Sequence, residues 1–182
     1  MSEELVVRCC APTLASLKTG NLFNCKCSSR EELYEKIRNL NKRLCCKGLR
    51  IMPLRFHSGT ALVYVYRPKK LQKDLMNETA CRLLNDHGYP CGQPTHCIMR
   101  LKERLEQNTE FPHEIGLFLG YPPEDVDGFI HRKDEAKCSG CWKVYGDVEN
   151  AKKTFARFRK CTSAYLEQFE KGRGIERLTV SA

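Results

Sequence analysis

Cys138 and Cys141 form the single CxxC motif of the sequence, in the order Cys-Ser-Gly-Cys. A CxxC pair performs dithiol redox chemistry when its first cysteine begins a helix, because the helix N-terminus lowers the thiol pKa. The residues that follow, 142–145, are typical of a strand instead. The same spacing can offer two thiolates to zinc or to iron. Cys138 and Cys141 are therefore candidate metal ligands, and two ordinary thiols in a turn are the simplest alternative.

A closed metal site would need two further ligands, and the sequence offers several without deciding between them. The candidates are other cysteines and one histidine: Cys25 with Cys27, Cys91 with His96 and Cys97, or Cys9 with Cys10. None of these sets forms a second CxxC, so the motif leaves metal binding and its absence both open.

His113 and Glu114 lie in a segment, residues 111–128, that is rich in glycine and proline. Such segments often shape a site, and a histidine can act there as a general acid or base. Cys10 could be a nucleophile activated by His113 if the fold joins them. Cys10, His113 and Glu114 are therefore the candidate catalytic residues. The alternative is that His113 is simply a polar residue at a helix end. Whether the protein is an enzyme stays open.

Other chemistries find less support. There is no phosphate-binding loop, and Asp125 and Asp127 would point in different directions on a helix, which makes them a poor carboxylate pair. The net charge of +9 is spread along the chain without a nucleic-acid-binding motif, so we do not expect a nucleic acid partner. No apolar run is long enough for a membrane span, and the acidic N-terminus does not resemble a signal peptide. We expect a cytoplasmic protein whose twelve cysteines are mostly free thiols.

The elements that must position these residues are mixed. Ser28, Ser29, Glu31 and Glu32 predict a helix start, and apolar residues at helical spacing continue the helix to Gly48. Residues 49–56 and 60–66 predict a hairpin. A long helix is expected from Pro68 to about Asp86, followed by shorter helices, a strand at 142–147 and a last helix that begins after Asp147.

This order predicts an α+β fold, because the strict alternation of strands and helices in a doubly wound sheet is missing. We expect a single compact domain over residues 1–175 with a short tail, 176–182. The domain would contain a small, mostly antiparallel sheet with a central hairpin, packed against several helices, and a long C-terminal helix. An additional strand is expected near the N-terminus.

Three blocks of sequence carry a resemblance to a known family: residues 10–18, 111–129 and 142–147, with the strand at 62–68 as a fourth. They resemble an uncharacterised family of anaerobic Gram-positive bacteria, domain of unknown function 3793. The resemblance implies a setting near flavodoxin and iron uptake, and hence a small acidic redox protein such as a flavodoxin as partner. Cys10, His113, Glu114 and Trp142 fall inside the matching blocks.

Our leading hypothesis is a thiol-containing pocket built from residues 10–14, 113–116 and 138–143. It would hold a small ligand or a metal, zinc or iron, in iron or redox metabolism. The hypothesis requires Cys10, His113 and Cys141 to lie within about 10 Å of one another. The alternative is a basic protein-interaction module without catalysis.

Overall fold

The computed structural model describes residues 1–107 and 110–181. The chain forms two compact units, residues 1–69 with 158–182 and residues 70–157. The boundaries between the units fall within α3 (Pro68–Leu75) and α8 (Val148–Glu170). Each unit is described by itself. The predicted α+β class, antiparallel sheet, hairpin and long C-terminal helix are confirmed, while the single domain boundary at 175 stays a prediction.

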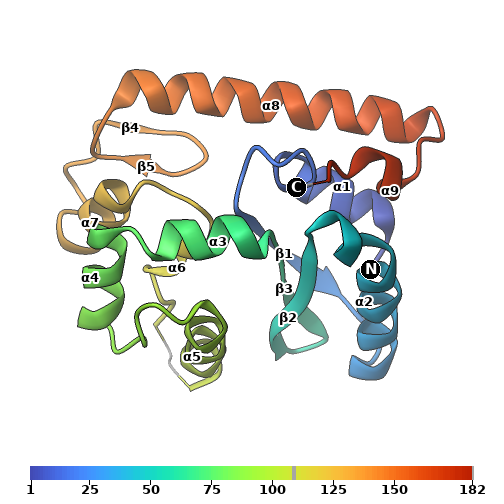
Figure 1. Ribbon diagram of the computed structural model, residues 1–182, viewed down its shortest axis with the longest axis horizontal. Helices are drawn as coiled ribbons and strands as arrows, with labels where there is room; N and C mark the ends of the chain where they lie inside the picture. The colour runs from blue at the N-terminus through green and yellow to red at the C-terminus, as the bar shows by residue number, and fades with distance from the viewer. Residues whose placement is uncertain (108–109, 182) are drawn as a thin grey trace. The chain divides into compact units, whose positions relative to one another are not determined.

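The first unit contains a three-stranded antiparallel sheet in the order β1-β3-β2 (Figure 1). The strands are β1 (Gly20–Lys26), β2 (Arg50–His57) and β3 (Thr60–Tyr66). The central strand, β3, has consecutive buried residues from Val63 to Val65, as a strand that is covered on both faces requires. β2 lies at the edge and its register shifts next to Pro53, because proline lacks the N–H that a regular ladder needs. The predicted hairpin is therefore confirmed.

Helices α1 (Glu3–Leu14), α2 (Arg30–Leu44), the 3-10 turn η1 (Cys45–Lys47) and α9 (Ile175–Leu178) complete this unit. The Ser29 side chain accepts a hydrogen bond from the Glu32 N–H at 3.1 Å and caps α2, as the capping-box signal predicted. The apolar positions of α2 are buried in a core shared with the sheet and α1.

The strand expected near the N-terminus is β1, which precedes α2 as predicted. The helix α1 in front of it was not predicted, and the Ser2 side chain caps it by accepting a hydrogen bond from Leu5 N–H at 3.2 Å. The expected tail continues as α9, in which Ile175 and Leu178 are buried. A short apolar segment of this kind gives little sequence signal, because its burial depends on the core that it meets.

Arg67 fixes several segments of the first unit together. Its side chain is 1% exposed and donates hydrogen bonds to four carbonyl oxygens, those of Thr13, Leu14, Lys47 and Val180. Burial lowers the pKa of Arg67, but the four acceptors keep the buried guanidinium satisfied. One residue thus joins α1, the turn after α2 and the C-terminal segment.

The second unit is mainly helical, with α4 (Glu78–Asp86), α5 (Pro94–Gln107), α6 (Ile115–Phe118) and α7 (Pro123–His131) (Figure 1). A two-stranded hairpin follows, made of β4 (Cys138–Ser139) and β5 (Lys143–Val144). The single helix expected from Pro68 to Asp86 is wrong. It divides into α3 and α4, because the Asn77 side chain accepts hydrogen bonds from the N–H groups of Thr79 and Ala80 and starts a new helix.

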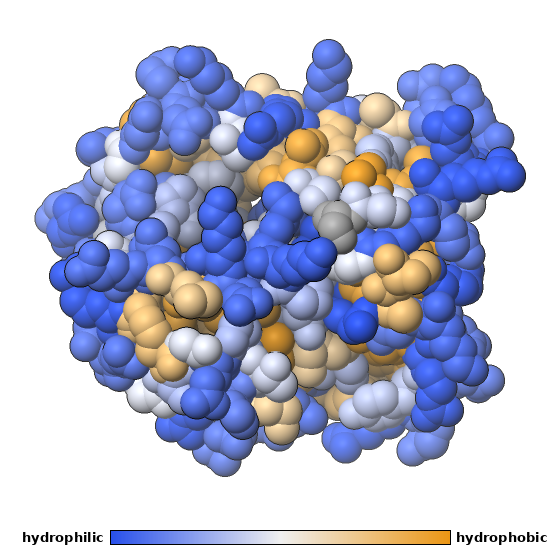
Figure 2. Space-filling model, viewed as in Figure 1, coloured by the Kyte–Doolittle hydropathy of each residue, from blue (hydrophilic) through white to orange (hydrophobic). Residues whose placement is uncertain are grey.

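Hydrophilic side chains cover most of the face shown in Figure 2, with small apolar areas between them. Among the described residues, no helix combines the length and the apolar composition that crossing a membrane requires.

Candidate functional site

Cys10 lies in the core of the first unit. Its side chain is 0% exposed and packs with Val6, Leu14 and other buried apolar residues. Burial raises the pKa of the Cys10 thiol well above its usual range, which keeps the sulfur protonated and weakly nucleophilic. His113, Glu114, Cys138 and Cys141 all belong to the second unit. The geometry around Cys10 is therefore that of a core residue.

Glu114 is also buried, in the interior of the second unit. Its side chain is 2% exposed and accepts a hydrogen bond from the Tyr89 hydroxyl at 2.7 Å. Arg104 forms an ion pair with the same carboxylate, with 2.9 Å between Nε and the oxygen. The angle at this nitrogen does not allow a hydrogen bond. Burial and the bond to Glu114 raise the pKa of Tyr89, so its hydroxyl remains a donor. Glu114 thus anchors the segment before α6 and is poorly placed for acid–base catalysis.

The Cys-Ser-Gly-Cys motif forms the turn of the β4–β5 hairpin. Cys138 pairs with Val144 across the hairpin and packs on an apolar cluster of Val144, Ala151 and Phe155. Cys141 is exposed at the turn. A side chain at Gly140 would overlap the Phe155 ring, so this position needs glycine. The motif is therefore explained locally by a tight turn on an apolar cluster.

Within the described residues, no three His, Cys, Asp or Glu side chains are grouped closely enough to hold a metal ion. Cys91, one of the alternative ligands, forms a disulfide with Cys81, with 5.5 Å between their Cα atoms. The expectation of free thiols is wrong for this pair, which sequence reasoning missed because the two cysteines share no motif. Cys138 and Cys141 as metal ligands stay a prediction without a third partner.

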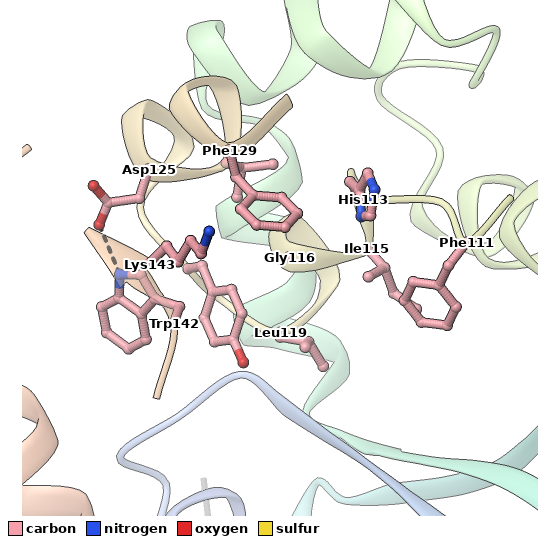
Figure 3. A pocket seen from close by; sticks show the side chains of 11 residues that line it. Phe111, His113, Ile115, Gly116, Leu119, Asp125, Phe129, Trp142 and Lys143 are labelled. Atoms are coloured by element: carbon pink, nitrogen blue, oxygen red, sulfur yellow. Dashed lines mark hydrogen bonds between the residues drawn. The ribbon is translucent and has the colours of Figure 1, made fainter. Parts of the chain in front are cut away.

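His113 does border a cavity, which we call the aromatic pocket. The pocket has a volume of about 350 Å³ and is formed entirely by the second unit (Figure 3). Five of its lining residues carry rings: Phe111, His113, Tyr121, Phe129 and Trp142. The others are small, aliphatic or charged: Ile115, Gly116, Leu119, Val126, Asp125 and Lys143. None of these lining residues is a cysteine.

The walls of the aromatic pocket are held by ring contacts. Tyr121 stacks on Trp142 with 4.9 Å between ring centroids, and Phe155 and Trp142 form a T-shaped pair with 4.5 Å between centroids. His113 and Phe129 form a T-shaped pair with 4.8 Å between ring centroids. Burial raises the pKa of Tyr121 to about 12, so its hydroxyl stays protonated and donates to the Cys141 carbonyl oxygen at 3.3 Å. These contacts hold the rings in fixed positions without a ligand.

Asp125 fixes the hairpin against α7. Its side chain is 3% exposed, and it accepts hydrogen bonds from Trp142 Nε1 at 2.7 Å, from Tyr145 N–H at 2.7 Å and from Gly146 N–H at 2.8 Å. Figure 3 shows the bond to Trp142 at the side of the pocket. Asp125 and Asp127 do point differently, since Asp127 is partly exposed and pairs with His131. Asp125 is therefore a positioning residue.

Gly116 brings α6 and α7 close together at the pocket. A Cβ at this position would lie 2.8 Å from Val126 Cγ2 and 3.1 Å from Tyr121 Cδ2, both tighter than ordinary contact. The absence of a side chain lets Val126 and Tyr121 approach the backbone of α6. This explains one glycine of the segment that the sequence singled out.

A second, more polar hollow of about 670 Å³ shares Phe111 and His113 with the aromatic pocket. Its other lining residues include Arg104, Glu114 and Lys133. The segment from Phe111 to Glu114 therefore separates an apolar cavity from a charged one. This accounts for its mixture of aromatic, imidazole and carboxylate side chains.

Comparison with known proteins agrees with the sequence resemblance. The model of the family described as protein of unknown function (DUF3793) matches residues 6–179. The chain belongs to the DUF3793 family. No curated protein and no solved structure matches it. The DUF3793 match spans both units, so the buried Cys10 and the aromatic pocket belong to one family sequence.

Several pocket residues of this DUF3793 protein were not singled out from the sequence. Lys143 was assigned only to a strand, Phe129 only to the block of residues 111–129, and Asp125 was set aside as half of a poor carboxylate pair. One signal was available. Trp142 is the only tryptophan of the chain and follows directly after the Cys-Ser-Gly-Cys turn, where a large ring must find a partner.

Proposed function

We propose that the protein binds a small, flat, mainly apolar molecule in the aromatic pocket. The observation that carries this proposal is the set of rings around a cavity of about 350 Å³. Ligand sites typically have volumes of roughly 300–1,000 Å³ and combine apolar walls with a few polar groups. Asp125, Lys143 and His113 are the polar groups here.

The preformed walls support a binding role. Trp142 is held by ring contacts with Tyr121 and Phe155 and by a hydrogen bond to Asp125. A ligand would therefore meet rings that are already ordered, and binding would cost little additional side-chain entropy. Flat aromatic ligands suit such walls, because ring pairs at centroid distances of about 4.5–7 Å attract each other beyond the area they bury.

The chemistry of the lining favours binding over the thiol pocket of the earlier hypothesis. No cysteine lines the cavity, and the carboxylates of Asp125 and Glu114 are engaged by protein donors. Among the described residues, none forms a hydrogen bond with a ring nitrogen of His113, so this imidazole of the pocket is open to a ligand. A role in iron or redox metabolism and a flavodoxin-like partner stay predictions.

The proposal is tested with N-phenyl-1-naphthylamine, an uncharged aromatic probe that accepts energy from tryptophan. Because Trp142 is the only tryptophan and lines the pocket, its emission should fall in a saturable manner as probe emission rises. A Phe129→Ala variant removes one wall and should weaken the binding several-fold.

The control is Tyr34→Ala, which removes an exposed aromatic ring from α2 in the first unit. It should leave probe affinity unchanged. Unsaturable energy transfer, or equal affinity of the native protein and the Phe129→Ala variant, would refute the proposal. Circular dichroism establishes that both variants are folded.

A further inference from the structure

The two oppositely charged side chains of the aromatic pocket, Asp125 and Lys143, differ in how free they are to bind a ligand. Asp125 is buried, and its two oxygens are occupied by three N–H groups of the protein. A carboxylate that already accepts several N–H donors has little hydrogen-bonding capacity left for a ligand. The carboxylate of Asp125 therefore stabilises the hairpin and is not free to bind a ligand.

Lys143 is the positively charged residue of the pocket, and its contacts with the rest of the protein are weak. In Figure 3 its amine extends from β5 toward the space beside Phe129 and Gly116. Its Nζ lies 5.6 Å from the centroid of the Phe129 ring and 3.5 Å from the carbonyl oxygen of Lys133. That carbonyl contact is at the outer limit of a hydrogen bond. Among the described acidic side chains, none forms an ion pair with this ammonium.

An ammonium carries three N–H donors, so Lys143 retains donors that its contact with the Lys133 carbonyl oxygen does not use. A ligand carboxylate placed at Lys143 would form a charge-assisted hydrogen bond, which is stronger than a bond between neutral groups. A ligand cation would be repelled by the same charge. The aromatic walls and the amine thus select a molecule with a flat apolar body and one negative end.

Resting on the proposed function, we infer that the ligand of the aromatic pocket is an aromatic carboxylate, with its rings against Trp142 and Phe129 and its carboxylate on Lys143. Lys143 then determines the preference for an anionic ligand over a neutral one. The rings contribute the part of the affinity that is the same for both ligands. The two contributions are separable by experiment, because they come from different side chains.

The test compares 2-naphthoate with 2-naphthamide, which have the same rings and nearly the same size but differ in charge. Isothermal titration calorimetry at pH 7 measures both affinities. We expect the naphthoate to bind about tenfold more tightly, as a hydrogen bond to a charged group implies. In Lys143→Met, which keeps an apolar stem of similar length, the ratio of the two affinities should fall to about one.

Lys152→Met is the matched control, since Lys152 is exposed on α8, does not line the pocket and carries the same charge. Its preference for naphthoate should equal that of the native protein. Equal affinities for both ligands in the native protein, or a preference that survives in Lys143→Met, overturn the inference. If N-phenyl-1-naphthylamine binds and naphthoate does not, the pocket binds neutral ligands and the anion inference is refuted. If none of the three binds, the proposed function is refuted as well.

Discussion

Asp125 should be the most sensitive polar position of the second unit, and Asp125→Asn tests how strongly it holds the pocket. The carboxylate accepts three hydrogen bonds in a 3% exposed position. Asparagine offers one oxygen and one NH₂ group. Whichever way the amide is turned, either Trp142 Nε1–H or the pair of backbone N–H groups faces another donor.

The expected cost follows from this geometry. Losing one hydrogen bond to a charged group and leaving a buried donor unpaired costs about 2–3 kcal/mol of unfolding free energy. The control is Asp127→Asn, two residues along α7, which removes the same charge from a partly exposed side chain. Among the residues that the structure describes, its one ion-pair partner is His131 on the next turn, so the change should cost less than about 0.5 kcal/mol.

The measurement is urea unfolding followed by tryptophan emission. Because Trp142 is the only tryptophan, the emission reports on the second unit alone. The native emission of Asp125→Asn should also move to longer wavelength, since the indole loses its acceptor and becomes more hydrated. If the two variants agree within about 0.5 kcal/mol, the reasoning that Asp125 fixes the hairpin against α7 is wrong.

Three further outcomes are expected. Arg67→Met should lower the unfolding free energy of the first unit by about 3–5 kcal/mol, because four carbonyl oxygens lose their donor. Urea unfolding followed by circular dichroism measures this loss, and a loss below about 1 kcal/mol would contradict the reasoning. Reducing the Cys81–Cys91 disulfide should destabilise the second unit by about 3 kcal/mol, because the unfolded chain gains loop entropy. Dithiothreitol should therefore lower the urea midpoint of the native protein, followed by tryptophan emission. The midpoint of a variant with serine at both positions should not change. The hydrogen bond from Arg43 lowers the pKa of Glu176 to about 2, below the unfolded value, so this ion pair stabilises fully above about pH 5 and is lost as pH falls toward 2. Glu176→Gln should therefore make stability less dependent on pH in that acidic range, and an unchanged pH profile would argue against the pair.

Much of the first unit could be predicted from the sequence, because its signals are local. Ser29 caps α2, and the residues at helical spacing after it are buried. The hairpin of β2 and β3 was visible from two strand-like runs, residues 49–56 and 60–66, which are joined by a short turn that contains Gly59. The helix break at Asn77 was missed, because the helical pattern of apolar residues continues on both sides of the cap.

The sequence by itself determined the α+β class and the family, since these depend on residue types in order along the chain. Tertiary structure alone decided which reactive side chains face a cavity. Cys10 is an ordinary nucleophile by type, yet it is buried in a core, whereas Lys143 reaches a pocket from a two-residue strand. Asp125 acquires its role from N–H groups about twenty residues away. Burial and hydrogen bonding between distant segments set these roles, and neither is encoded at one position of the sequence.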